Sequence, residues 1–445
     1  MCNETIKEAG INESMEPGRP AVVHPVLVAA FAALDRASIR WCLLRGDAEL
    51  DRVGADVDLL IAQEDRAAVT TVLERMGYVR LASWGWATHR FFVTYDVEHD
   101  TWVKLDFVSA LSFGPHAAIE TGAAAACLER REMVDGIPLL AGEDRFWALL
   151  LHCILDRGDV PERHGGPLRA LAGSVGADGP LGSWFAAHAA HGWDPALALS
   201  LARDGNWPPL LAMGKQMGSV WRGQSGPMLA IRGRRALVRR MTKLRTLLLE
   251  PGLTIALLGP DGAGKSTLAA ELGRTFYFGT RSVYMGLYGA GSAVGTPPRG
   301  PVDHVGRLAG HVGRQWSGYL RAVFHRSRGR LVVYDRFGYD ALLRLPRNRW
   351  IGARIRRWLL SHAIPSPDLV LLLDAPAELL HARKQDHDLA TLESQRRAYL
   401  DLAARMGNVS VVPADRSADS VRRDVTQLVW RRYVARRRGR AAKRA

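Results

Sequence analysis

The sequence predicts an α/β protein in which an α+β domain and a helical connector precede a doubly wound parallel sheet. Three observations predict this order. Short strands alternate with helices up to about Ala141, and the next stretch is rich in Ala, Leu and Trp with Gly and Pro breaks. After Gly252, short apolar runs alternate with segments of helical spacing, the pattern of strands buried on both faces of a parallel sheet. A chain of 445 residues is also longer than one ordinary domain.

The strands of the C-terminal sheet are predicted from continuous apolar runs. They lie at residues 253–258, 282–285, 331–334, 369–373 and 410–412. Segments with helical spacing separate these strands, as a doubly wound fold requires. Residues 289–311 are rich in Gly, Pro and Ser, so we expect a loop there.

The N-terminal strands are predicted at residues 39–46, 56–62, 89–98 and 102–109. These patterns give five segments with expected bounds. They are a flexible tail over 1–20, an α+β domain over 21–141, a helical connector with a basic end over 142–250, the parallel-sheet domain over 251–433 and a basic tail over 434–445.

The charge of the chain is strongly positive, with a net value of +15 and a sequence pI near 10.1. Basic residues crowd two segments, 232–245 and 431–444. We interpret them as a solvated helix face and a tail. Contact with an anionic membrane surface or another polyanion is the alternative.

We find no targeting signal in the sequence and therefore expect a cytoplasmic protein. No run of about 18 apolar residues predicts a transmembrane helix. The first 20 residues are polar and of mixed charge, unlike a secretory signal. The four cysteines, Cys2, Cys42, Cys127 and Cys153, have no paired metal-ligand spacing, which fits a reducing compartment.

A phosphate-binding loop is predicted where the first C-terminal strand ends. The segment GPDGAGKS satisfies the pattern G-x-x-x-x-G-K-[ST] with Gly259, Gly264, Lys265 and Ser266. Glycines let backbone N–H groups surround phosphate oxygens, and the following helix directs its positive end at them. Lys265 would reach the β- and γ-phosphates of a nucleoside triphosphate, and the Ser266 hydroxyl would bind Mg²⁺. We expect the loop residues to contact the nucleotide: Gly259, Asp261, Gly262, Ala263, Gly264, Lys265, Ser266 and Thr267.

Residues 252–433 resemble thymidylate kinases. The resemblance is carried by GPDGAGKSTL and by three later segments in the same order: LVVYDRFGYD, PDLVLLLDAPAELLHARK and QRRAYLDLA. It implies a P-loop kinase fold, ATP as the phosphoryl donor, Mg²⁺, and a small-molecule phosphate acceptor. Thymidylate kinases are commonly dimers, so the resemblance also implies a homodimer.

The same resemblance implies roles for individual residues. Asp261 would approach the sugar or phosphate of the acceptor, and Arg336 would hold the acceptor phosphate. Asp335 would support the water shell of Mg²⁺, and Arg383 would close over the phosphates from the lid, residues 381–397. The arginine cations, Arg336 and Arg383, suit phosphoryl transfer, which depends on charge stabilisation and exclusion of water.

The acceptor stays open because one family element has no counterpart. The Arg-Glu-Pro-Gly-Gly element that follows the second strand in thymidylate kinases is replaced by MGLYGAGSAVGTPPRG. The simplest acceptor is a nucleoside monophosphate. A sugar or sugar phosphate used in cell-surface polymers is the second hypothesis, and a nucleotide-binding adaptor that docks through its basic segments is the third. A nucleic-acid enzyme is the remaining alternative, without any recognisable reading module.

The N-terminal domain resembles the nucleotidyltransferase fold. In CLLRGDAELDRVGADVDLLIA, a strand ends at Gly46 and a second strand carries Asp56 and Asp58 at alternate positions, on one side of the strand. Asp106 in WVKLDFVS fits the third carboxylate of that family, and three such groups could hold Mg²⁺. Gly46-Asp47 replaces the usual Gly-Ser, so a catalytic domain, an inert one and an unrelated α/β domain remain open.

Overall fold

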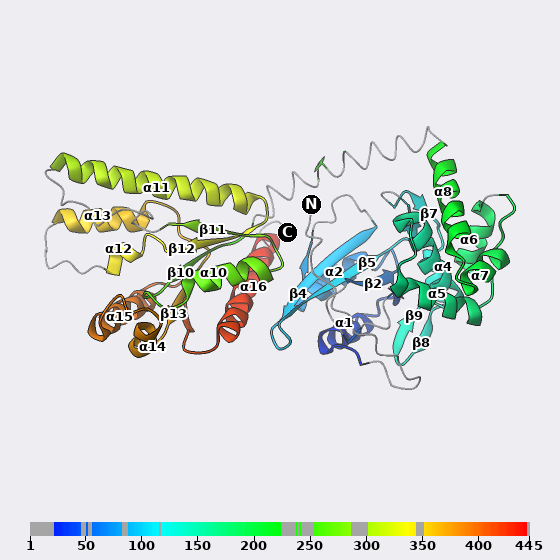
Figure 1. The fold of residues 1–445 in the computed structure, drawn as a ribbon, viewed down its shortest axis with the longest axis horizontal. Helices are drawn as coiled ribbons and strands as arrows, with labels where there is room; N and C mark the ends of the chain where they lie inside the picture. Colours follow the sequence, from blue (N-terminus) through cyan, green and yellow to red (C-terminus); the bar gives the residue numbers. More distant parts are fainter. Residues whose placement is uncertain are drawn as a thin grey trace. The chain divides into compact units, whose positions relative to one another are not determined.

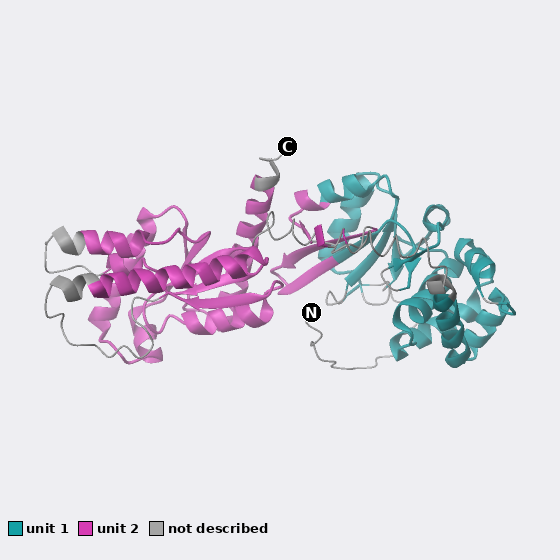
Figure 2. Ribbon diagram, turned by 90° about the horizontal axis from the view of Figure 1, so that it is seen from above, with its two compact units in different colours: residues 1–72, 105–223 teal, residues 73–104, 224–445 magenta. Residues whose placement is uncertain are grey.

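The chain divides into two compact units in a computed structural model (Figure 2). Unit 1 comprises Met1–Val72 and Leu105–Gly223, and unit 2 comprises Leu73–Lys104 and Gln224–Ala445. The structure describes residues 22–45, 50–51, 56–81, 88–114, 117–189, 191–223, 237, 240–241, 252–285, 301–343 and 351–442.

The first half of the chain contains a seven-stranded mixed sheet, a separate two-stranded sheet formed by its sixth and seventh strands, and the helices that follow (Figure 1). Its strands are β1 (Trp41–Arg45), β2 (Asp56–Ile61), β3 (Val79–Arg80), β4 (His89–Asp96), β5 (Thr101–Val108), β6 (Ser112–Phe113), β7 (Ile119–Glu120), β8 (Glu132–Val134) and β9 (Ile137–Leu139). Its helices are α1 (Pro25–Arg36), α2 (Arg66–Arg75), α3 (Ala124–Glu129), α4 (Gly142–Leu151), the π-helix η3 (His152–Arg157), α5 (Glu162–Ser174), α6 (Pro180–His188), α7 (Pro195–Arg203) and α8 (Trp207–Gly223).

The seven-stranded sheet has the order β3-β4-β5-β2-β1-β9-β8. Its central strands share one hydrophobic core with the helices that follow. Leu44 of β1 and Leu60 of β2 pack in the same cluster as Phe146, Trp147 and Phe185 from α4 and α6. The helical region from Gly142 to Gly223 is therefore part of unit 1 rather than a separate connector, because its apolar faces are buried against the sheet.

Unit 2 is built around a five-stranded parallel sheet (Figure 1). Its strands are β10 (Thr254–Leu258), β11 (Thr280–Tyr284), β12 (Leu331–Asp335), β13 (Leu369–Asp374) and β14 (Val409–Pro413). Its helices are α10 (Lys265–Thr275), α11 (Pro301–Ser327), α12 (Asp340–Leu343), α13 (Ile351–His362), α14 (Ala377–Arg383), α15 (Leu389–Arg405) and α16 (Ala418–Ala442).

The parallel sheet has the order β11-β12-β10-β13-β14, which confirms the five predicted strands to within two residues at each end. Both faces are covered, and successive strand residues enter different cores. Ile255 and Leu257 of β10 join the cluster that contains α10 and α16, whereas Ala256 and Leu258 join the one that contains α11 and α15. The mixed α/β class is thus observed, with a parallel sheet compatible with a P-loop kinase-like domain.

Residues Leu73–Lys104 belong to unit 2, and Trp102 is one of the side chains that anchor them there. The indole Nε1 of Trp102 donates a hydrogen bond to the carbonyl of Thr275, at the end of α10, over 2.9 Å. The Trp102 ring meets Phe276 and Trp430 edge to face, with centroids 5.3 and 5.1 Å apart. The segment that we had assigned wholly to the N-terminal domain therefore packs on α10 and α16.

Two expectations about irregular segments are corrected. Within the predicted loop at 289–311, residues 301–311 form the start of α11, and the remainder lies outside the described residues. Pro301 suits a first helical position, because its missing N–H would have no partner there.

The C-terminal residues 434–442 continue α16 rather than forming a tail. Their arginines bind backbone within unit 2, since Arg437 donates to the carbonyl of Arg80 over 2.5 Å and Arg438 donates to that of Arg75 over 3.1 Å. Of the other basic segment, 232–245, only residues 237, 240 and 241 are described. Among the described residues, no helix is both long enough and apolar enough to span a membrane.

Candidate phosphate-binding site

The loop between β10 and α10 turns at glycine residues. Three glycines adopt positive φ: Gly259 at 141°, Gly262 at 85° and Gly264 at 88°. A Cβ at Gly259 would meet the carbonyl of Leu373 at 2.6 Å, and one at Gly262 would meet that of Leu380 at 2.7 Å. A Cβ at Gly264 would meet nothing within 4 Å. The first two glycines thus allow close packing, and the third turns the exposed backbone into the helix.

Lys265 lies beneath this loop and is 8% exposed. Its Nζ donates hydrogen bonds to the carbonyls of Gly259 at 2.8 Å and Pro260 at 2.7 Å, and it lies 3.9 Å from Oδ1 of Asp261. Burial lowers the pKa of Lys265, and the nearby Asp261 carboxylate opposes that effect. The loop is therefore curled around its own ammonium group, for which phosphate oxygens would be stronger acceptors than neutral carbonyls.

Arg336 is brought to the loop by the parallel pairing of β10 and β12, which places the ends of both strands at one edge of the sheet. Its Nη2 donates to Oδ1 of Asp261 over 2.7 Å. Burial opposes its charge, but Asp261 and Asp340 outweigh burial and raise the pKa of Arg336. Lys265, Asp261 and Arg336, all predicted from the sequence, are thus in one cluster.

Two residues of this cluster were missed by the sequence analysis. Tyr399 on α15 donates its hydroxyl to Oδ1 of Asp340 over 3.1 Å. Burial raises the pKa of Asp340, against the attraction of Arg336 and Lys265. Asp340 and Tyr399 lie in LVVYDRFGYD and QRRAYLDLA, two of the segments that resemble thymidylate kinases. That resemblance could have indicated that both residues lie near the site.

The lid region places its cations differently from the expectation. Nη1 of Arg383 donates to the carbonyl of Ala414 over 3.0 Å, at the end of β14, rather than to a residue of the phosphate loop. The next residue, Lys384, pairs with Asp386 at 2.7 Å and interacts electrostatically with Asp261 and Arg336. Lys384, although exposed and paired with Asp386, is thus a cation close enough to Asp261 to be attracted by it.

A second arginine of the lid is held at the sheet edge. Arg396 on α15 binds both carboxylate oxygens of Asp374, the last residue of β13, at 2.7 and 2.9 Å. This bidentate pair raises the pKa of Arg396 and fixes α15 against the end of the sheet.

The residues proposed for Mg²⁺ and for the nucleotide fit that chemistry. Ser266 and Thr267 are exposed in the first turn of α10, directly after the open backbone of Gly264. Asp335 is half-buried at the end of β12. Hydroxyl and carboxylate oxygens are the hard ligands that Mg²⁺ prefers.

The three N-terminal carboxylates fit a metal ion less well. Asp56 is exposed and Asp106 is buried, on β2 and β5, which are neighbours in the sheet. Asp58 lies opposite Arg45 on β1, and an Arg45 nitrogen lies 2.8 Å from its Oδ2. Since a guanidinium already neutralises Asp58, this side chain is poorly placed to act as a metal ligand. Gly46 and Asp47 lie outside the described residues.

Comparison with known proteins gives a partial likeness. The chain is 28% identical over 125 residues to a probable thymidylate kinase of Sulfolobus acidocaldarius, a match that covers 25% of this chain and 60% of that protein. The chain resembles thymidylate kinases over part of its length. It spans about 60% of the length of this curated relative. No family profile matches the chain.

The structure comparison matches part of this chain to a thymidylate kinase from Candida albicans. The two share 16% identity with a TM-score of 0.32, over 41% of this chain and 94% of the other.

Proposed function

We propose that this protein transfers the γ-phosphoryl group of ATP to a small phosphate-bearing acceptor, most simply a nucleoside monophosphate. The observation that carries the proposal is the convergence of Lys265 and Arg336 on Asp261 at one edge of the parallel sheet. Two cations linked by one carboxylate suit a reaction that joins two anionic substrates.

In the transfer, an oxygen of the acceptor phosphate bonds to the γ-phosphorus, and the bond from that phosphorus to the β–γ bridging oxygen breaks to leave ADP. Backbone amides of residues 259–264 and the ammonium of Lys265 would hold the donor phosphates. Arg336 would bind the acceptor phosphate, and Lys384 would add positive charge from the lid. Ser266 and Asp335 would hold Mg²⁺, which neutralises phosphate charge when bound.

A different small acceptor, such as a sugar phosphate, is the second candidate. The segment MGLYGAGSAVGTPPRG favours it, because it replaces the element that follows the second strand in thymidylate kinases. That segment follows β11 directly, at the strand end nearest Asp335.

For residues 21–141, we propose a nucleotidyltransferase-like domain without metal-dependent catalysis. The carboxylates of Asp56 and Asp58 at alternate positions of β2 support the likeness. The Arg45–Asp58 ion pair supports the lack of metal chemistry.

The test is incubation of the full chain with labelled ATP, Mg²⁺ and a panel of nucleoside monophosphates and sugar phosphates, followed by mass spectrometry. We expect one acceptor class to gain 80 Da, about the mass of one transferred phosphoryl group, in step with ADP release. ADP release without any phosphorylated product, or no turnover at all, would contradict the proposal. Transfer to sugar phosphates alone would select the second candidate.

A further inference from the structure

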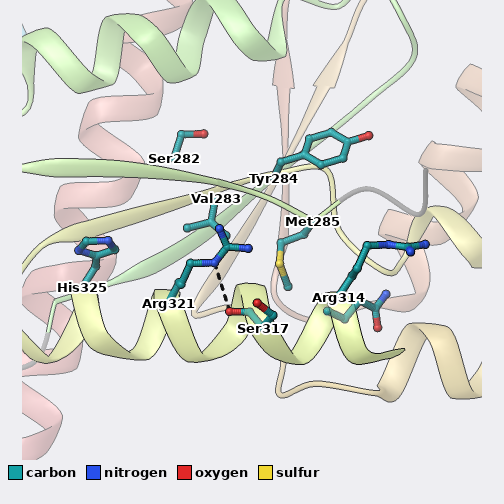
Figure 3. A pocket seen from close by; sticks show the side chains of 9 residues that line it. Ser282, Val283, Tyr284, Met285, Arg314, Ser317, Arg321 and His325 are labelled. Atoms are coloured by element: carbon teal, nitrogen blue, oxygen red, sulfur yellow. Dashed lines mark hydrogen bonds between the residues drawn. The ribbon is translucent and has the colours of Figure 1, made fainter. Parts of the chain in front are cut away.

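A cavity of about 410 Å³ lies between β11 and α11 in unit 2 (Figure 3). Figure 3 shows Arg321 and His325 extending from α11 toward β11, and Met285 extending from the strand toward the helix. A volume in this range is typical of small-molecule sites, which run from about 300 to 1,000 Å³.

One face of α11 forms a wall of this cavity. Arg314, Ser317, Arg321 and His325 follow one another at spacings of three and four residues, so they lie along a single stripe of the helix. The cavity therefore extends along α11 for several helical turns.

The cavity begins next to the reacting edge of the sheet. The backbone N–H of Met285 donates to the carbonyl of Asp335 over 3.0 Å, and Tyr284 pairs with Asp335 in the parallel ladder. Asp335 directly precedes Arg336, the arginine proposed to hold the acceptor phosphate. The far end lies at His325, where Arg330 donates to Nδ1 over 2.8 Å.

The lining carries positive charge and no carboxylate. Two arginines, Arg314 and Arg321, contribute to it, and none of the described lining residues is Asp or Glu. Burial lowers the pKa of His325, and the neighbouring charges of Arg330, Arg281 and Arg328 lower it further. Arg314 and Arg321 are exposed, so solvent screens part of their charge, but an anion in the cavity would still be attracted to them.

A buried polar atom also lacks a partner at this wall. Gln315 is 4% exposed, and its Nε2 donates to the carbonyl of Leu360 over 3.1 Å. Its Oε1 is buried and has no hydrogen-bond partner among the described residues. Because this oxygen has almost no accessible surface, a ligand in the cavity does not reach it, and Gln315 serves to hold α11 against Leu360.

We propose that this cavity binds the end of the phosphate acceptor remote from the reacting oxygen, and that this end carries a second anionic group held by Arg321 and His325. The inference rests on the proposed function for its assignment to the acceptor. It deepens that function by favouring the second candidate, a different small acceptor, because a nucleoside monophosphate whose base is neutral lacks the second anionic group. Acceptors with two phosphates, or with a phosphate and a carboxylate, have it.

The first experiment measures anion binding independently of phosphoryl transfer. The full chain with Lys265→Ala, labelled at histidine nitrogens, is titrated with inorganic pyrophosphate, and the pKa of His325 is followed by NMR, with His325→Gln for assignment. We expect pyrophosphate to raise the pKa of His325, since a bound anion stabilises the imidazolium. Arg321→Gln should weaken pyrophosphate binding about tenfold, as loss of a charge-assisted hydrogen bond predicts.

The matched control is Arg356→Gln, which removes the same charge from an exposed position on α13 that does not line the cavity. It should leave pyrophosphate binding unchanged. An unshifted His325, or equal weakening by the two arginine variants, would overturn the cavity as an anion site.

The second experiment separates a group of the acceptor from an independent anionic regulator. With saturating ATP, we expect pyrophosphate to compete with the acceptor, and Arg321→Gln to raise the KM of a doubly anionic acceptor about tenfold without changing that of a singly anionic one. Non-competitive inhibition would identify a regulator and overturn the assignment to the acceptor. Absence of any transfer, with pyrophosphate binding intact, would overturn the proposed function and this assignment with it, but not the anion site.

Discussion

Arg336 has an unfavourable backbone conformation at the residue that binds Asp261. Its φ is 64°, in the left-handed region that residues other than glycine rarely adopt. Such conformations cost about 1–3 kcal/mol and persist where surrounding structure over-determines them. The ion pair with Asp261, at 2.7 Å, is one such constraint, and it directs the guanidinium toward the phosphate loop.

Replacement of Arg336 by Lys keeps the charge but loses the planar group that can bind two phosphate oxygens at once. We expect kcat/KM for the acceptor to fall about 100-fold or more, by comparison with the loss of a transition-state hydrogen-bond donor. The affinity for ATP should change by less than about threefold, because the donor site keeps Lys265. Steady-state kinetics and equilibrium ATP binding measure the two effects.

Arg383→Lys is the matched control, since the Arg383 guanidinium is bound to the carbonyl of Ala414. Its effect on kcat/KM should stay below about threefold. A loss as large as that of Arg336→Lys would contradict the assigned positions of the two arginines.

At the level of elements, an ion pair joins the turn after β4 to α16 within unit 2. Arg422, 9% exposed at its side chain, binds both oxygens of Asp100, and Tyr95 donates its hydroxyl to Oδ1 over 2.6 Å. Burial opposes the charge of Asp100, but the hydrogen bonds from Arg422 and Tyr95 outweigh burial and lower its pKa. The charged carboxylate therefore stabilises the packing of this segment.

Asp100→Asn tests this contact, because the substitution keeps the shape of the side chain and Asn tolerates the positive φ of 52° at this position. We expect the free energy of unfolding at pH 7 to fall by about 1 kcal/mol, since the pair is partly exposed. The stabilisation is present above the unfolded pKa of Asp, near 4, and is lost as pH falls through the lowered folded pKa. The difference between the two proteins in denaturant titrations should therefore be smaller near pH 3 than at pH 7. A constant difference, or none, would contradict this account.

At the level of the whole molecule, local signals in the sequence were sufficient for the C-terminal sheet and its phosphate loop. An apolar run such as residues 369–373, when it lies between helical segments, predicts a buried strand of a parallel sheet. The loop pattern spans eight consecutive residues. Contacts between distant residues were not predictable in this way. The anchoring of Trp102 on Thr275 and the pairing of Asp340 with Tyr399 depend on three-dimensional packing that no local pattern encodes.

The contacts of the lid arginine and the boundaries of the two units were also not predictable from local sequence patterns. The sequence predicted that Arg383, after the fourth strand, would reach the phosphates. The structure shows that Arg383 instead donates to the carbonyl of Ala414, whereas the next residue, Lys384, interacts electrostatically with Asp261. Similarly, the Ala- and Leu-rich sequence after Glu143 predicted helices correctly. Their burial against β1 and β2 in unit 1 could be seen only in the structure.

The central claim is that the amides around Gly264 and the ammonium of Lys265 bind a nucleoside triphosphate. Equilibrium binding of ATP with Mg²⁺ by calorimetry tests it most directly, on the full chain, on Lys265→Ala and on Arg45→Ala, a control in unit 1. We predict that Lys265→Ala weakens ATP binding at least about 100-fold, since a buried cation on the phosphates is worth roughly 3 kcal/mol, and that Arg45→Ala binds as the unchanged chain does. Equal affinity in all three proteins, or no ATP binding by the unchanged chain, would contradict the account.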